Sequence, residues 1–288
     1  MANSALKYHN NVKLFREAII TTAEVTGFRI DLVEKDYFCS HILNYLFSFD
    51  DTKLIFKGGT CLSKVYTNFY RMSEDLDFTI PTPLGTSRKV RRNSIKNFKQ
   101  RVSDIGKILP VFKVSKEPSG ANVSTQYIAE VSYSSVVSGD TGNIKIEVGL
   151  REPIVDEIVV REAKTLLYDP FTEQSVVLPI PIKCFSIEEL YAEKIRAALT
   201  RLNPAIRDLY DLDYAVQNNV IDITNKRLLK FLQQKLAIEG TGEIDISESK
   251  KQELLIQVKT ELKSVLRKKD YGNFDFNRAY NLLLEVNK

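Results

Sequence analysis

Two short stretches of this chain carry most of its structural information, Lys53-Leu-Ile-Phe-Lys-Gly-Gly-Thr60 and Asp75-Leu-Asp-Phe-Thr-Ile80. The first is an apolar run stopped by two glycines, which predicts a strand, a tight turn and then a helix that includes Phe69. The second alternates polar and apolar residues and is followed by Pro81, which predicts a strand with one buried face. Together they predict a strand, turn and helix unit followed by a strand that carries two acids.

Further elements are predicted on both sides of these stretches. Strand candidates lie at 111–114, 127–133 and 144–150, and the Ser- and Gly-rich segment 134–143 predicts a hairpin loop. Apolar residues recur at helical spacing over residues 10–50 and again beyond Pro181. We therefore predict an α+β chain, with a mixed sheet and helices in residues 1–183 and a helical C-terminal lobe in residues 184–288.

Composition narrows the classes of protein. The 288 residues include 41 Lys and Arg against 37 Asp and Glu, a net charge of +4. No apolar run approaches the roughly 18–20 residues that a membrane helix needs, so we expect a cytoplasmic protein with no membrane association. Only three cysteines and two histidines are present, which argues against a Cys/His zinc cluster. His41 follows a helical apolar pattern and is interpreted as a packing residue rather than a catalytic base.

Asp75 and Asp77 give the first chemical signal. Residues i and i+2 of a strand project from the same face, so both carboxylates are within reach of one metal ion, whereas Leu76 and Phe78 point to the opposite face. Mg²⁺ is commonly bound by one or two carboxylates together with substrate phosphates. The alternative is a solvated strand face with incidental acids.

The glycine turn before these acids favours the metal interpretation. Gly58, Gly59 and Thr60 follow a strand and open a helix, where free backbone amides and a hydroxyl are suited to a phosphate. Glu147 is a candidate third carboxylate, because it alternates with the apolar residues of its strand. It equally fits an exposed residue paired with Lys145.

The helical half contains a second group of charged residues. Asp208 and Asp211 are three residues apart and share a helix face, and Lys194 and Arg201 are seven apart, again on one face. A lysine facing a phosphate site would act as a mobile point charge. The alternative is a set of surface ion pairs, which contribute little to stability.

Taken together, these segments resemble the AbiEii/AbiGii toxin family of nucleotidyltransferases, which includes the MenT toxins. The resemblance rests on Lys57-Gly-Gly-Thr-Cys-Leu-Ser-Lys64, Arg71-Met-Ser-Glu-Asp-Leu-Asp-Phe78, Ile144-Lys-Ile-Glu147, the segment 189–211 and the N-terminal Glu34-Lys-Asp-Tyr37. It implies a DNA polymerase β-like nucleotidyltransferase fold and a toxin of a type IV toxin–antitoxin or phage abortive-infection system. Glu147 stands where many nucleotidyltransferases have Asp.

The resemblance also implies a role for each matching residue. Gly58, Gly59 and Thr60 would hold the triphosphate of an NTP, Asp75 and Asp77 would hold Mg²⁺ (or Mn²⁺), and Lys194 would bind the nucleotide phosphates. Asp208 or Asp211 would be the essential acid of the last motif, and the Arg-Asp-x-Tyr-Asp spelling favours Asp208. Family members studied as enzymes add nucleotides to the 3′ end of tRNA and so block translation.

Two further sets of residues are assigned from their positions. Ser73 lies two residues before Asp75, so we place it at the nucleotide site, where phosphorylation would add negative charge beside the acids. Arg88, Lys89, Arg91 and Arg92 begin a basic stretch with no acid before Asp104, which is suited to an RNA backbone. A solvated helix face is the alternative for this stretch.

The function predicted from these observations is that of a metal-dependent nucleotidyltransferase toxin acting on tRNA and neutralised by a cognate antitoxin. Nucleotidyl transfer to a protein or a small molecule stays open, as does a non-catalytic, nucleotide-binding toxin.

Overall fold

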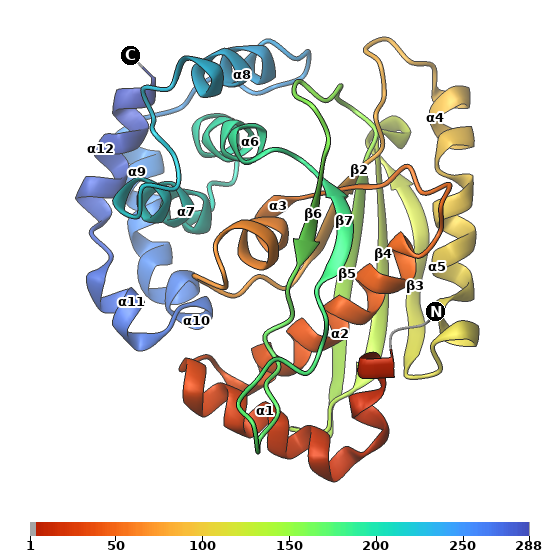
Figure 1. Ribbon diagram of the computed structural model, residues 1–288. Helices are drawn as coiled ribbons and strands as arrows, with labels where there is room; N and C mark the ends of the chain where they lie inside the picture. Colours follow the sequence, from red (N-terminus) through yellow and green to blue (C-terminus); the bar gives the residue numbers. More distant parts are fainter. Residues whose placement is uncertain (1–3, 288) are drawn as a thin grey trace. The chain divides into compact units, whose positions relative to one another are not determined.

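The computed structural model describes residues 4–287 (Figure 1). The chain divides into two compact units, of which the first comprises Met1–Ile154 and Ile158–Cys184 and the second Val155–Glu157 and Phe185–Lys288. The short segment Val155–Glu157 therefore belongs with the C-terminal helices, although the first unit continues on both sides of it in the sequence.

A mixed sheet forms the centre of the first unit, in agreement with the predicted fold class. In the described residues it has seven strands in the order β3-β4-β5-β2-β1-β7-β6. Neighbouring strands are antiparallel, except that β2 is parallel to β5 and β1 is parallel to β7. The strands are β1 (Ile55–Lys57), β2 (Leu76–Thr79), β3 (Phe112–Ala121), β4 (Gln126–Ser134), β5 (Thr141–Gly149), β6 (Val159–Ala163) and β7 (Ile180–Cys184).

The helices of the first unit include two long N-terminal ones. α1 begins after Asn11, whose side chain accepts a hydrogen bond from the Leu14 amide, and α2 is buried along most of its length. α5 is amphipathic and buries Phe98, Val102 and Ile105. The elements are η1 (Ser4–Asn10), α1 (Val12–Thr26), α2 (Ile30–Phe47), α3 (Gly58–Cys61), η2 (Leu62–Tyr66), α4 (Arg88–Ser94), α5 (Lys96–Ile108) and η3 (Asn122–Ser124).

The second unit is built from helices, as Figure 1 shows in green and blue. α6 is capped by Ser186, whose side chain accepts from the Glu189 amide. No helix in the described part of the chain has the length and apolar character needed to span a membrane. The elements are α6 (Ile187–Thr200), α7 (Ile206–Gln217), α8 (Lys226–Leu236), α9 (Glu248–Gln257), η4 (Val258–Leu262), α10 (Lys263–Val265), α11 (Lys268–Asn273) and α12 (Phe276–Val286).

The elements agree with the sequence in most places, and two of the differences concern the glycine turn and the edge of the sheet. The helix after the glycine turn stops at Tyr66 rather than including Phe69, because the Thr67 amide and hydroxyl both donate to the Leu62 carbonyl, and Asn68 and Phe69 adopt positive φ. β6 and β7 were not predicted. β7 contains Pro181, which cannot donate to a ladder and normally argues against a strand.

Candidate active site

The predicted acids lie on neighbouring strands of the sheet. Asp75 immediately precedes β2, and Asp77 is inside it. In the register of the sheet Asp77 is the partner of Glu147 on β5 and of Lys57 on β1. Partners across a sheet share a face, so these three side chains form one polar row. The flanking residues Leu76 and Phe78 are fully buried on the opposite face.

The glycine turn packs directly against these acids. Gly58 has φ +77°, and a Cβ at this position would clash with the Asp77 carboxylate oxygen Oδ2. A Cβ on Gly59 would lie 2.7 Å from Arg71 Nη2 and 3.0 Å from Ser73 Oγ. Only residues without a side chain allow this approach. The glycine turn therefore lies directly beside Asp77 and Ser73.

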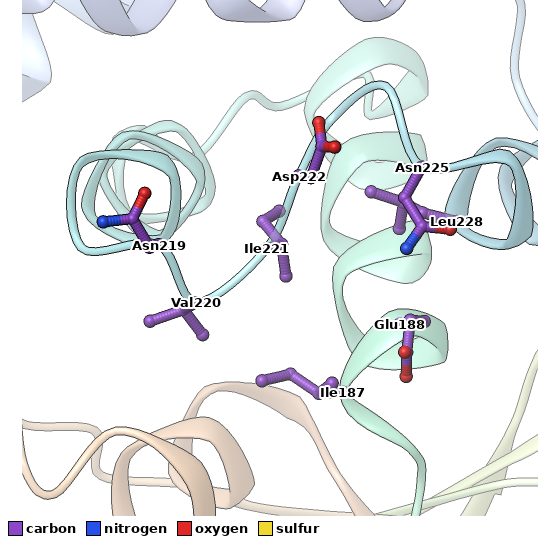
Figure 2. A pocket seen from close by; sticks show the side chains of 8 residues that line it. All are labelled: Ile187, Glu188, Asn219, Val220, Ile221, Asp222, Asn225 and Leu228. Atoms are coloured by element: carbon purple, nitrogen blue, oxygen red, sulfur yellow. The ribbon is translucent and has the colours of Figure 1, made fainter.

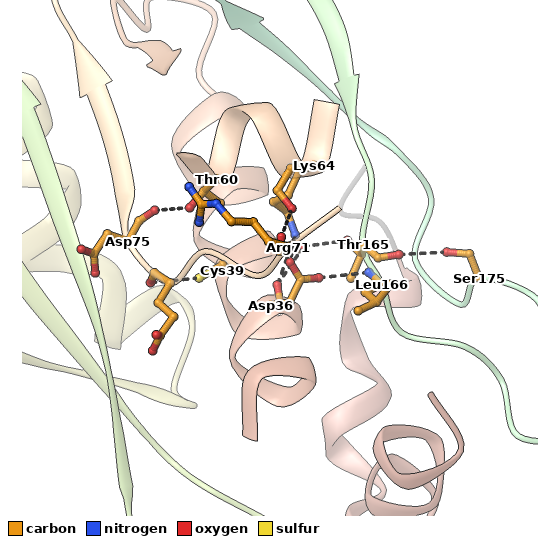
Figure 3. A network of polar contacts seen from close by, with 12 residues as sticks. Asp36, Cys39, Thr60, Lys64, Arg71, Asp75, Thr165, Leu166 and Ser175 are labelled. Atoms are coloured by element: carbon orange, nitrogen blue, oxygen red, sulfur yellow. Dashed lines mark hydrogen bonds and ion pairs between the residues drawn. The ribbon is translucent and has the colours of Figure 1, made fainter. Parts of the chain in front are cut away.

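Thr60 is placed differently from the other residues of the turn. Its side chain is buried, and its hydroxyl donates to the backbone carbonyl of Asp75 (Figure 3). The hydroxyl thus holds the chain at the point where the first acid emerges.

Glu147 is engaged by two neighbouring side chains. Lys145 Nζ lies 2.8 Å from Glu147 Oε2, and Gln126 Nε2 donates to Oε1. Burial lowers the pKa of Lys145, but its hydrogen bond to Glu147 and the nearby charges of Glu147, Asp75 and Asp77 outweigh burial and raise that pKa. The charges of all three acids therefore favour the protonated form of Lys145.

Two carboxylates in this site are available to a divalent cation. Among residues 4–287, no three His, Cys, Asp or Glu side chains are arranged as a metal-ion site. Asp75 and Asp77 nevertheless provide two carboxylates, the number that Mg²⁺ uses when substrate phosphates complete its coordination. The residues present thus fit a cation that shares its ligands with a triphosphate.

A buried polar network supports the segment that leads into Asp75 (Figure 3). Asp36 on α2 binds Lys64 Nζ at 2.6 Å and accepts from the Leu166 amide at 3.0 Å. Lys35 binds Glu74 at 2.8 Å, and Cys39 donates to the Glu74 carbonyl. The segment Glu34-Lys-Asp-Tyr37 therefore stabilises the fold around Asp75, and Lys64 has a structural role as the ionic partner of Asp36.

Arg71 is a residue of this site to which the sequence assigned no role. Its side chain is only 2% exposed, and its guanidinium donates to the Met72 carbonyl at 2.9 Å. Together with the 2.7 Å approach to Gly59, this makes Arg71 part of the wall behind the glycine turn. Its place in the Arg-x-Ser-x-Asp motif was the one available signal.

The four charged residues singled out in the second unit form one cluster. Lys194 Nζ lies 2.7 Å from Asp208 Oδ1 and 3.0 Å from Asp211 Oδ2, and Arg201 lies 2.7 Å from Asp208 Oδ2. Both aspartates are buried, whereas Lys194 remains 14% exposed. The ion pairs expected as the alternative are present, but their acids are not on the surface.

A second buried pair in this unit was not predicted. Glu189 and Lys235 are fully buried, and their charged atoms lie 2.6 Å apart. Glu189 also accepts from the amides of Val155 and Asp156, each at 3.1 Å. This acid therefore fastens the segment Val155–Glu157 within the second unit.

The basic stretch lies on α4 and the start of α5. Arg88, Lys89 and Arg92 line a pocket of about 560 Å³, whereas Arg91 is not among its lining residues. The structure thus separates Arg91 from the other three residues with which it was grouped.

A smaller pocket of about 200 Å³ lies in the second unit (Figure 2). Ile187 and Glu188 at the start of α6 face the loop between α7 and α8 across it. No residue predicted to act on a nucleotide lines it, so it is not included in the candidate site.

His41 is a packing residue, as predicted. It is 3% exposed, and burial together with the neighbouring His9 lowers its pKa from 6.5 to about 3. Its Nε2 has no hydrogen-bond partner among the residues that are described. A histidine held neutral in the core is not a candidate catalytic base.

Comparison with known proteins identifies the family of this chain. The family described as "Nucleotidyl transferase AbiEii toxin, Type IV TA system" matches residues 41–281. The fold is similar to that of JHP933 from Helicobacter pylori, with a TM-score of 0.55 and 16% identity over 90% of this chain and 91% of that one. It is equally similar to the nucleotidyltransferase toxin MenT4 from Mycobacterium tuberculosis, with a TM-score of 0.55 and 19% identity over 90% and 85%. No curated protein matches the sequence.

Proposed function

Because the chain belongs to the AbiEii family of nucleotidyltransferase toxins of type IV toxin–antitoxin systems, we propose that it transfers nucleotides from an NTP to the 3′ end of tRNA. The transfer would block translation in the cytoplasm, and a cognate antitoxin would oppose it. The observation that carries this proposal is the contact of Gly58 with Asp77, which joins a phosphate-binding turn to a strand with acids.

The acids and the turn have separate tasks in this proposal. Asp75 and Asp77 hold Mg²⁺, or Mn²⁺ in its place, with Glu147 as the third carboxylate because it is the sheet partner of Asp77. When bound, the cation neutralises triphosphate charge and favours deprotonation of the attacking hydroxyl. The backbone of Gly58 and Gly59 binds the triphosphate, and Ser73 lies beside Gly59 to donate a hydrogen bond. Thr60 positions Asp75 through its carbonyl.

Within the second unit, Lys194 is the candidate for binding nucleotide phosphates. Lys194 is 14% exposed, and the buried Asp208 and Asp211 fix its position. We therefore assign Lys194 to phosphate binding and the two aspartates to positioning Lys194. Asp208 has the larger role because it also binds Arg201.

The experiment that tests this function follows a labelled nucleotide. The purified protein is incubated with each labelled NTP, Mg²⁺ and total RNA, and RNA, protein and small molecules are then separated. Label in tRNA supports the proposal, label in protein or a small molecule indicates another acceptor, and no label indicates a non-catalytic toxin.

Asp75→Ala is the matching variant, and we expect it to abolish both labelling and growth inhibition. Asp140→Ala, which removes an exposed aspartate in the turn between β4 and β5, is the control and retains both. Toxicity that persists in Asp75→Ala contradicts an enzymatic mechanism.

A further inference from the structure

A basic pocket lies on the first unit, outside the candidate active site. It measures about 560 Å³, and no acidic residue is among those that line it. The α4 and α5 helices, drawn in yellow in Figure 1, supply its cations. Its charged and aromatic lining consists of Arg88, Lys89, Arg92, Lys96, Lys99 and Tyr127.

Both helices supply these cations. Arg88, Lys89 and Arg92 on α4 and Lys96 and Lys99 on α5 line the same pocket. Arg91 does not line the pocket, and its guanidinium donates to the Thr86 carbonyl and, at 3.2 Å, to the Val123 carbonyl. Arg91 therefore connects α4 to the segment at Val123, whereas the other cations line the pocket.

Folding stability alone does not account for this arrangement. α4 has seven residues and buries none of them, so packing contributes little to it. Its cations at spacings of three and four repel one another. Lys99 adds a further charge, with its Nζ 5.3 Å from the centre of the Tyr127 ring. A bound polyanion would turn this unfavourable concentration of charge into a favourable one.

The sheet separates this pocket from the acids. Tyr127 is the register partner of Val148, which in turn is the partner of Phe78. Asp77 and Glu147 are the immediate neighbours of Phe78 and Val148 along their strands, so they project from the opposite face. The pocket therefore does not bind the reacting phosphate of a nucleotide whose triphosphate lies at Asp77.

We propose that this pocket anchors the sugar–phosphate backbone of the acceptor RNA at a distance from its reacting 3′ end. The identity of the acceptor rests on the proposed function. An acidic protein fits less well, because the apolar residues that line the pocket, Ile95 and Tyr127, are only 1% and 3% exposed and offer little surface for a partner to bury. Phosphates need only the cations.

RNA binding is the first test and needs no catalysis. Labelled tRNA is titrated without NTP or metal at several salt concentrations, and binding is followed by fluorescence anisotropy. Arg88→Glu/Arg92→Glu is expected to weaken binding by about 10-fold or more and to reduce the slope of log K against log salt by about 2. Unchanged affinity and slope overturn the proposal.

A matched pair of variants on α5 controls for net charge. Lys96 lines the pocket, whereas Lys107 lies at the other end of the same helix and is 79% exposed. Lys96→Glu is expected to weaken RNA binding, and Lys107→Glu is expected to bind RNA as the native protein does. Equal weakening of RNA binding in both variants overturns the proposal. Binding to polyglutamate is measured in parallel, and the proposal also fails if Lys96→Glu loses binding to polyglutamate while its RNA binding is unchanged.

Acceptor length is the second test. The ratio of kcat/KM for full-length tRNA to kcat/KM for an oligonucleotide of a few residues is measured for each variant. Arg88→Glu/Arg92→Glu is expected to lower this ratio by about 10-fold, because a short acceptor does not reach the pocket. If the ratio of the two kcat/KM values is unchanged in the variant, the pocket does not anchor the acceptor RNA. If the native protein labels no RNA, the proposed function fails, and the binding experiment still decides the role of the pocket.

Discussion

Each unit holds a lysine against aspartate, and the two clusters differ in how much solvent reaches the lysine. In the first unit Lys64 is 1% exposed and Asp36 is 3% exposed. In the second unit Asp208 and Asp211 are as deeply buried, but Lys194 is 14% exposed. A fully buried pair serves only the fold, whereas a partly exposed lysine can also contact a ligand. Burial, rather than residue type, separates the two purposes.

The largest expected effect is the loss of protein stability when the pair of Asp36 and Lys64 is broken. Asp36→Ala leaves the buried Lys64 ammonium without its carboxylate and the Leu166 amide without its acceptor. We expect the free energy of unfolding to fall by about 3–5 kcal/mol. Urea denaturation followed by circular dichroism measures this loss.

The control for Asp36→Ala is Asp140→Ala, which removes an exposed aspartate and is expected to change stability by less than about 0.5 kcal/mol. In the double variant Asp36→Leu/Lys64→Met no charge is buried, so much of the stability should return. A small loss in Asp36→Ala would mean that the pair contributes little to the fold.

Lys194→Ala tests the cluster of the second unit in the same way. Its main effect is expected on nucleotidyl transfer, which should fall by about 100-fold because a phosphate contact is lost. The loss of stability should be smaller than in Asp36→Ala, since Asp208 keeps its contact with Arg201. Labelled transfer measures the activity, NTP titration measures the affinity for the nucleotide, and urea denaturation measures the stability.

Lys226→Ala, an exposed lysine on α8, is the control for Lys194→Ala and should behave as the native protein does. If Lys194→Ala costs as much stability as Asp36→Ala and leaves NTP affinity unchanged, both clusters are purely structural.

His41 extends the comparison to a buried titratable group that forms no ion pair within residues 4–287. Its pKa is about 3 in the folded protein and near 6.5 when unfolded. Between these values the unfolded chain binds the additional proton, so stability rises with pH and falls as the solution is acidified. This group alone should cost about 2 kcal/mol between pH 7 and pH 5.

His41→Gln measures that contribution. The variant should lose less stability than the native protein between pH 7 and pH 5, with both followed by urea denaturation at each pH. Parallel pH profiles would show that proton uptake by His41 does not contribute to acid destabilisation.

Local patterns were sufficient for the centre of the sheet. The strand before the glycine turn, the acid-bearing strand and the hairpin formed by β4 and β5 were all confirmed. In each case alternation or a glycine break is a property of adjacent residues. β7 escaped prediction because Pro181 hides its strand pattern, and β6 because its sequence, Val-Val-Arg-Glu-Ala, does not alternate. The helix end at Tyr66 depends on hydrogen bonds from Thr67 that periodicity does not report.

The long-range parts of the candidate site were beyond the same reasoning. Arg71 was quoted within a motif, but its approach to Gly59 depends on how two segments fold together. Arg91 was grouped with its basic neighbours, yet its guanidinium binds two backbone carbonyls. One-dimensional spacing identifies a charge and not its partner.

The amino-acid order specified the chemistry of this protein, because strand alternation and helix spacing fix which face a side chain occupies relative to its neighbours. Two acids on one strand, a glycine turn and a basic helix followed from that alone. Tertiary structure decided which charges are buried, that Asp77 and Glu147 are register partners, and that the basic pocket lies across the sheet from them. These properties depend on contacts between residues distant in sequence, which no local period encodes.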